Sequence, residues 1–258
     1  MIDPAEIRDG LDRREFFLEY LPTISLIDGR CIGAEALIRW RRPNGVVLPA
    51  EFIPLVEKSL LSGLITYWVI ETVAIELGDW LAANPSAHIS LNAPPELLGR
   101  GGMAYAAAKS GLIRHASQVI LEVTERGIPD FLGVESINQR GGMGARIALD
   151  DVTFVAGARL AVLGRCNFDA IKLDKSLIDQ IGPQCHAPEW LRSVTALVES
   201  SQLLVIAEGV ETEQQAAILR AANIQAAQGF YFSRPVPVEE FMAVFRDREP
   251  PSRTGRST

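Results

Sequence analysis

Acidic and amide side chains stand at the ends of short apolar runs in this sequence. The residues in question, all oxygen donors, are Glu35, Asn92, Glu122, Asp150, Asp151 and Glu208. An ionised carboxylate is costly to bury unless it has a partner, so acids attached to runs this apolar indicate a site and not a packed core. Several carboxylates brought together would also repel one another unless cations lay between them. The pattern therefore predicts a cation site.

Hard divalent cations suit these oxygen donors best. No histidine stands at a strand end beside the acids, which favours Mg²⁺ or Mn²⁺ over zinc. The adjacent residues Asp150 and Asp151 are suited to bridging two ions, and two ions can activate a water and stabilise an in-line phosphoryl displacement. Lys172, inside the apolar run 170–174, could hold the attacking water or offset phosphate charge. The chemistry that this predicts is metal-assisted phosphoryl transfer.

Each of these residues also has an ordinary structural interpretation. Glu35 could form a salt bridge with Arg39, and Lys172 with Asp174 could form a surface ion pair of little value. The pair at 150–151 could cap a helix instead of binding metal. A site is favoured because all the acids fall at equivalent strand ends, which scattered structural roles would not require.

Short strands and helices alternate along most of the chain, which indicates how the acids are brought together. Roughly eight such units predict an α/β fold of the TIM-type (β/α)₈ barrel class, in which chemistry lies at the carboxyl ends of the strands. Residues 16–26 form a strand candidate, and the turn at Asp28-Gly29 leads back into the strand that holds Glu35. We therefore expect a modified barrel whose first strand is antiparallel.

Length and composition fit one domain. We expect the barrel to occupy residues 1–248 and the tail 249–258, rich in Pro, Ser and Arg, to be disordered. No uninterrupted apolar run reaches the roughly 18 to 20 residues of a membrane span, and no signal pattern is seen, so we expect a cytoplasmic protein without a span. The three scattered cysteines argue against disulfides, and the net charge of −7 argues against long nucleic acid as a partner.

The segment Glu35-Ala36-Leu37, followed by Ile38-Arg39-Trp40, resembles the signature of the EAL domain, a family of bacterial phosphodiesterases that hydrolyse cyclic di-GMP. The resemblance covers nearly the whole chain. Its further matches are Phe52-Ile53-Pro54, Asn92, Glu122-Val123-Thr124-Glu125, Asp150-Asp151, Lys172-Leu173-Asp174, Glu208-Gly209-Val210-Glu211-Thr212, and Gln228-Gly229 with Phe232-Ser233-Arg234-Pro235.

The resemblance implies a role for each matching residue. One Mg²⁺ or Mn²⁺ ion would be held by Glu35, Asn92, Glu122 and Asp150, and a second by Asp150, Asp151 and Glu208. Catalysis would involve Lys172, which contacts the nucleophilic water, together with Glu208 and Glu35. Arg39 would bind a substrate phosphate, with Leu37, Gln228 and Leu21 as further substrate positions, and Glu125, Glu211 and Asp174 would support loops. The product would be the linear dinucleotide pGpG.

The chain departs from the family pattern in the loop after the paired aspartates. Active members usually carry Asp-Phe-Gly-Thr-Gly there, whereas this chain reads Asp-Val-Thr-Phe-Val-Ala-Gly over 151–157, without the glycines that allow a sharp turn. Leu21 also stands where a substrate-contacting Gln is usual, and Gln225 where an Asp is common. Two functional classes therefore stay open.

The first class is a metal-dependent cyclic di-GMP phosphodiesterase. The second is a catalytically weak or inactive EAL domain that acts as a cyclic di-GMP receptor or protein-interaction module, because the loop 152–157 is altered. A homodimer, and sensory domains in a longer parent chain, are left open as partners.

Overall fold

A computed structural model describes residues 2–124, 131–153, 166–182 and 185–248, and within them the sheet closes on itself. The order of its strands is β1-β9-β8-β7-β6-β5-β4-β2-β3, and β1 also pairs with β2, which joins eight strands into a barrel and leaves β3 as an appended edge. The strands are β1 Phe16–Ser25, β2 Cys31–Arg42, β3 Gly45–Val47, β4 His88–Asn92, β5 Val119–Thr124, β6 Arg146–Val152, β7 Ala170–Leu173, β8 Leu204–Ala207 and β9 Ala226–Ala227. The predicted TIM-type α/β barrel is confirmed.

The first strand runs against its neighbours, as predicted. β1 is antiparallel to both β2 and β9, whereas the pairs from β2 through β4 to β9 are parallel. The turn between β1 and β2 contains Gly29 at φ 75°, a left-handed conformation that glycine adopts without steric cost. A short hairpin can connect only antiparallel strands, so this turn fixes the reversed direction of β1.

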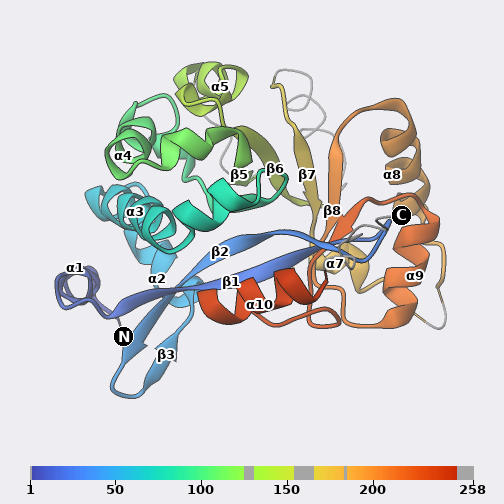
Figure 1. Cartoon of the computed structure of the whole chain (residues 1–258), viewed down its shortest axis with the longest axis horizontal. Helices are drawn as coiled ribbons and strands as arrows, with labels where there is room; N and C mark the ends of the chain where they lie inside the picture. The colour runs from blue at the N-terminus through green and yellow to red at the C-terminus, as the bar shows by residue number, and fades with distance from the viewer. Residues whose placement is uncertain (1, 125–130, 154–165, 183–184, 249–258) are drawn as a thin grey trace, which may run out of the picture.

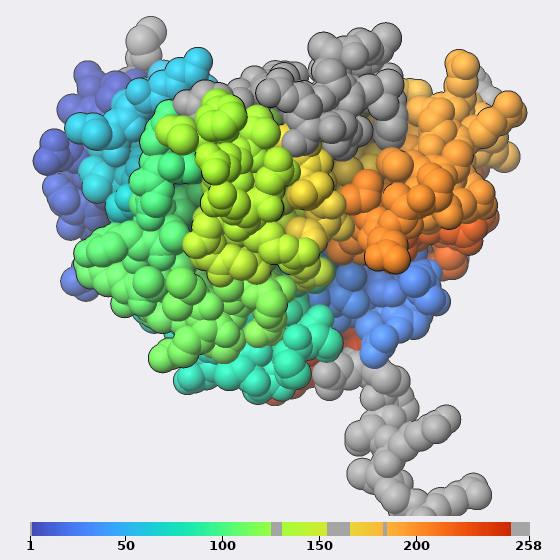
Figure 2. All heavy atoms as spheres, turned by 90° about the horizontal axis from the view of Figure 1, so that it is seen from above, coloured from blue at the N-terminus to red at the C-terminus, as the bar shows by residue number. Residues whose placement is uncertain are grey.

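The helices surround the barrel (Figure 1). They are α1 Pro4–Asp12, α2 Pro49–Val56, α3 Leu60–Ala83, α4 Gly102–Ser110, α5 Phe131–Asn138, α7 Lys175–Ile178, α8 Glu189–Ser200, α9 Glu213–Ala221 and α10 Val238–Asp247, with 3₁₀ turns η1 Pro95–Leu97, η2 Leu112–Gln118 and η4 Arg140–Gly142. In the space-filling view α4, α5 and α8 form much of the outer surface on one side (Figure 2). The helix expected near 158–163 and the tail 249–258 lie outside the described residues.

A thin apolar layer fills the barrel below the acidic residues. Ile120, Ala148 and Ala170 form a buried cluster against Leu204. Three of these positions lie two residues before Glu122, Asp150 and Lys172, so they share the same inward face of their strands. The polar residues at the mouth therefore stand on a packed floor.

One helix bears on the expectation that the chain has no membrane span. α3 has 24 residues and a mean hydropathy of 1.5, which makes it long and apolar enough to cross a membrane by these two measures. The expectation counted uninterrupted apolar residues and so overlooked a helix whose polar residues are spaced out. Helices of this composition also occur in protein cores, and one face of α3, including Val73, Leu77 and Leu81, is buried in the main core cluster.

Candidate metal centre and ligand pocket

The barrel brings the predicted oxygen donors together at the carboxyl ends of its parallel strands. Asn92 at the end of β4 is in register with Glu122 on β5, and Thr124 of β5 is in register with Asp150 on β6. Glu208 directly follows β8. Neighbouring parallel strands have their carboxyl ends at the same rim of the barrel, here called the mouth. A side chain at the carboxyl end of any of these strands therefore lies at the mouth.

Lys172 lies at the centre of the acidic residues. It is 1% exposed, and its ammonium approaches four carboxylates. The distances from its Nζ are 2.6 Å to Glu208 Oε1, 2.9 Å to Glu35 Oε2, 2.9 Å to Glu122 Oε2 and 3.6 Å to Asp150 Oδ1. The alternative of a surface ion pair with Asp174 is therefore wrong. The carboxylate of Asp174 instead accepts a hydrogen bond from the backbone N–H of Ser176 and caps α7.

One ammonium does not neutralise the acids around it. Burial raises the pKa of Glu122, and the neighbouring Glu35 raises it further. Burial likewise raises the pKa of Asp150 and lifts that of Glu208 to about 8. The same carboxylates hold the pKa of Lys172 well above its ordinary value against the effect of burial. The mouth is therefore a site where additional positive charge is favoured.

The donor set fits divalent cations. Oxygens of Asp150, Asp151 and Glu208 lie within 4.8 Å of one another. Both carboxylate oxygens of Glu122 are buried, and apart from the ion pair of Oε2 with Lys172 at 2.9 Å neither has a partner among the described residues. Asn92 donates its Nδ2 to Glu35 Oε1 at 3.2 Å, which uses its amide nitrogen and not its amide oxygen. An all-oxygen set of this kind suits Mg²⁺ or Mn²⁺ better than zinc.

A β-bulge carries the two adjacent aspartates. Neighbouring residues of a regular strand point to opposite faces, but the register of β6 with β7 shifts between Leu149 and Val152. Asp151 takes φ 57° there, and its N–H donates to Asp150 Oδ1 at 2.9 Å. Aspartate tolerates this left-handed conformation better than most residues. Both residues belong to β6, so neither caps a described helix.

Arg39 pairs with a residue that the sequence did not single out. The alternative of a salt bridge between Arg39 and Glu35 is wrong, because Glu35 accepts a hydrogen bond from Lys172. The Nε–H of Arg39 instead donates to Glu19 Oε2 at 2.7 Å, and both side chains stand on the face that carries Leu37 inward. The sequence held one signal for Glu19. Side chains alternate between the two faces of a strand, and in the hairpin of β1 with β2 Glu19 lies opposite Leu37, on the face that Arg39 shares.

Gln228 ties the last strand to the first. It is buried, and its Nε2 donates to Thr23 Oγ1 at 2.8 Å and to the carbonyl of Leu21 at 3.4 Å. Gln225, which seemed a ligand position in the resemblance, accepts a hydrogen bond from the N–H of Val205 at 2.9 Å. It therefore serves the backbone of β8.

The loop-supporting positions are only partly described. Glu211 accepts a hydrogen bond from Lys175 Nζ at 2.7 Å, and Lys175 also pairs with Asp179 at 2.9 Å. This joins the turn after β7 to the turn after β8. Glu125 and residues 154–157 of the altered loop lie outside the described residues.

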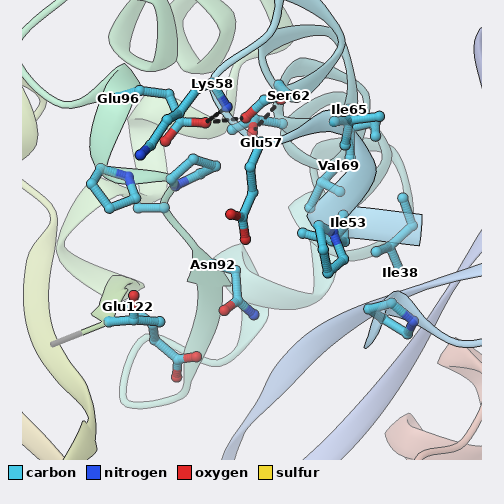
Figure 3. Close-up of a pocket in the computed structure, with 18 of the residues that line it drawn as sticks. Ile38, Ile53, Glu57, Lys58, Ser62, Ile65, Val69, Asn92, Glu96 and Glu122 are labelled. Atoms are coloured by element: carbon cyan, nitrogen blue, oxygen red, sulfur yellow. Dashed lines mark hydrogen bonds between the residues drawn. The ribbon is translucent and has the colours of Figure 1, made fainter. Parts of the chain in front are cut away.

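A cavity of about 870 Å³ opens beside the acids. Its lining includes Asn92, Glu122 and Asp151 and residues of α2 and α3. Figure 3 shows Glu57, which follows α2, directed toward Asn92. Ligand pockets commonly measure about 300–1,000 Å³. The mouth therefore combines a candidate metal centre with space for a ligand.

Comparisons with known proteins give the same family as the sequence motifs. The EAL domain family model matches residues 5–235. Rv1357c of Mycobacterium tuberculosis, described as uncharacterized, is 33% identical over 248 residues, which cover 92% of this chain and 80% of that protein. The Escherichia coli protein described as "Probable cyclic di-GMP phosphodiesterase PdeB" is 32% identical over 243 residues, or 92% of this chain and 46% of that protein.

A solved structure is also similar. The structure "PaMucR Phosphodiesterase, c-di-GMP complex" matches with a TM-score of 0.81 and 30% identity, covering 92% of this chain and 98% of that chain. The curated relative MucR comes from Pseudomonas aeruginosa. The chain spans about 40% of the length of another M. tuberculosis relative, Rv1354c.

Proposed function

Because this chain belongs to the EAL domain family, we propose that it hydrolyses cyclic di-GMP to linear pGpG with the help of two Mg²⁺ or Mn²⁺ ions. The observation that carries the proposal is the meeting of four carboxylates around Lys172, beside a pocket of ligand size. Carboxylates buried this close together repel one another and lower the stability of the fold. A purely structural role does not explain them, whereas binding cations does. The relatives named for cyclic di-GMP support the choice of substrate.

The residues divide between holding cations and binding substrate. Glu35, Asn92, Glu122 and Asp150 would hold one ion, and Asp150, Asp151 and Glu208 the other. When bound, the ions would activate a water and stabilise the charge that develops on the phosphate. The water oxygen bonds to phosphorus, the P–O3′ bond breaks, and the 3′ oxygen takes up a proton.

Two side chains of the barrel supply positive charge for the anionic substrate. The ammonium of Lys172 lies 2.6–2.9 Å from Glu208, Glu35 and Glu122, which fixes its position at the mouth, where it would contact the attacking water. Arg39 is held by Glu19 through its Nε, which leaves Nη2 of its guanidinium for a phosphate oxygen. Leu37 also lines the pocket.

The receptor or interaction-module alternative is not favoured by any feature of the described residues. It depends on the loop 152–157, of which residues 154–157 are not described. A cytoplasmic location, a homodimer and attached sensory domains stay predictions.

Turnover of cyclic di-GMP tests the proposal. We expect incubation with Mg²⁺ or Mn²⁺, followed by chromatography, to show pGpG, and Glu35→Ala to abolish its formation because a metal ligand and a partner of Lys172 are lost. The circular dichroism spectrum of the variant should match the parent. Binding of cyclic di-GMP without turnover under all these conditions would contradict the proposal and support a receptor.

A further inference from the structure

The ion pair between Arg39 and Glu19 is joined by a single hydrogen bond. Arg39 shares the inward face of β2 with Glu35 and Leu37 and lies nearer the carboxyl end of that strand. Its Nε–H donates to Glu19 Oε2 at 2.7 Å, and its Nη1 donates to the carbonyl of Ile38 at 3.1 Å. Among the described residues, neither Glu19 Oε1 nor Arg39 Nη2 has a hydrogen-bond partner.

Both edges with which the guanidinium of Arg39 could bind a phosphate are half occupied. A guanidinium offers two pairs of N–H groups to an oxyanion, one formed by Nε and Nη2 and the other by Nη1 and Nη2. Glu19 takes the Nε end of the first edge, and the carbonyl of Ile38 takes the Nη1 end of the second. A phosphate therefore reaches Nη2 alone unless one of these two acceptors leaves.

Glu19 is the acceptor that is free to leave. Its side chain is 26% exposed, so its carboxylate can turn into water, which solvates the charge. The side chain of Arg39 is 9% exposed and is held in place by the surrounding barrel. The carbonyl of Ile38 belongs to the backbone of β2 and moves only with the sheet. Rotation of Glu19 would open the edge formed by Nε and Nη2 to a phosphate.

We propose that Glu19 is an internal competitor of the substrate phosphate and lowers the affinity of the protein for cyclic di-GMP. In the free protein its carboxylate neutralises Arg39, and a bound phosphate must displace it to make two hydrogen bonds with the guanidinium. The same carboxylate also repels a phosphate that contacts Nη2 alone. The inference rests on the proposed function, which assigns a substrate phosphate to Arg39, and it adds the residue that determines the strength of this contact.

Glu19→Gln tests the inference because it separates charge from orientation. The amide oxygen of glutamine can still accept a hydrogen bond from Nε, so the guanidinium keeps its orientation while the competing charge is lost. We would measure Kd for cyclic di-GMP with the full chain in chelator, and kcat and KM with Mn²⁺. We expect Kd and KM to fall by about tenfold, with a smaller change in kcat. A residue that only orients Arg39 would leave both constants unchanged or raise them.

Glu6→Gln is the matched control. It removes the charge of another acid that pairs with an arginine of β2, since Glu6 Oε1 accepts from Arg42 Nη2 at 2.7 Å. Arg42 lies on the opposite face of β2 from Arg39, so this variant should keep the Kd and KM of the parent.

Thermal unfolding supplies a second measurement. Glu19→Gln should lower the Tm of the free protein, because a buried guanidinium loses its opposing charge. Saturating cyclic di-GMP should then raise the Tm of this variant by more than it raises the Tm of the parent, because the variant binds more tightly.

The outcomes separate this inference from the proposed function. A Kd and KM of Glu19→Gln equal to or above those of the parent would overturn the inference, and the proposed function would stand if the parent forms pGpG. An equal gain in Glu6→Gln would also overturn it, because the net charge of the chain would then explain the gain. If the parent binds cyclic di-GMP without hydrolysing it, the proposed function fails and Kd in chelator still decides the inference. If the parent neither binds nor hydrolyses it, both fail.

Discussion

The ammonium of Lys172 is the only cation that the described chain places among the acids of the mouth, and Lys172→Met removes its charge. Methionine is unbranched and of similar length, so the packing of the barrel interior is largely kept. The Nζ atom lies 2.6–3.6 Å from four carboxylate oxygens. Without bound cations, the variant leaves these carboxylates with no opposing charge.

The expected loss follows from the burial of the cluster. Removing one partner of a buried ion pair costs about 3–5 kcal/mol. Protonation recovers part of this, because the pKa of Glu208 is already raised to about 8 and rises further without the ammonium. A native pKa above the unfolded value means that stability is lost as pH rises through it, so the deficit should grow with pH. At about pH 9 we expect a loss near 3 kcal/mol, or roughly 6–12 °C in Tm.

Thermal unfolding in chelator, at about pH 6 and about pH 9, measures this loss. Added Mn²⁺ should recover part of it, because the cations replace the missing charge. Lys175→Met is the matched control, since Lys175 is 47% exposed and its ion pairs with Asp179 and Glu211 should contribute about 1 kcal/mol or less. A Tm of Lys172→Met equal to the parent's in chelator at the higher pH would refute the reasoning.

Other predictions concern metal binding, acidity and close packing. Millimolar Mg²⁺ or Mn²⁺ should stabilise the fold by a few kcal/mol, and a Tm indifferent to both metal and chelator would count against the site. Burial raises the pKa of Glu76, which accepts from Tyr20 Oη at 2.6 Å, so stability falls as pH rises from the ordinary carboxyl range. Glu76→Gln should flatten this fall in urea titrations, and an unchanged slope would contradict it. Gly33→Ala should cost more than about 2 kcal/mol in the same assay, because its Cβ would lie 2.2 Å from the His88 carbonyl oxygen; parent-like stability would contradict that register.

The sequence could predict the barrel and the placement of its acids because both depend on local patterns. Alternating strands and helices imply parallel strands, and parallel strands put their carboxyl ends at one edge. Glu122 and Asp150 could therefore be assigned to one mouth without knowing a single contact. The reversed first strand followed from the short turn at Asp28-Gly29 in the same way.

Contacts that depend on register or depth could not be predicted. Lys172 lies two residues before Asp174, and the sequence is equally consistent with a surface ion pair between them and with a buried lysine at the site. Only the closed barrel shows that Lys172 is buried among acids. The pairing of Arg39 with Glu19 depends on the register of β1 with β2. The orientation of Glu57 depends on where α2 ends, and helix ends are the least certain part of such predictions.

The short seam between β1 and β9 determines when the barrel can be completed during synthesis. It carries two residue pairs, and the hydrogen bond that reinforces it joins Gln228 to Thr23, 205 positions earlier in the chain. The β1–β2 hairpin can form as soon as it leaves the ribosome, but its outer edge stays unpaired until β9 has been made. Contacts this distant in sequence form slowly. We therefore expect refolding to be limited by closure of this seam, and nascent chains interrupted before β9 to associate through the open edge of β1.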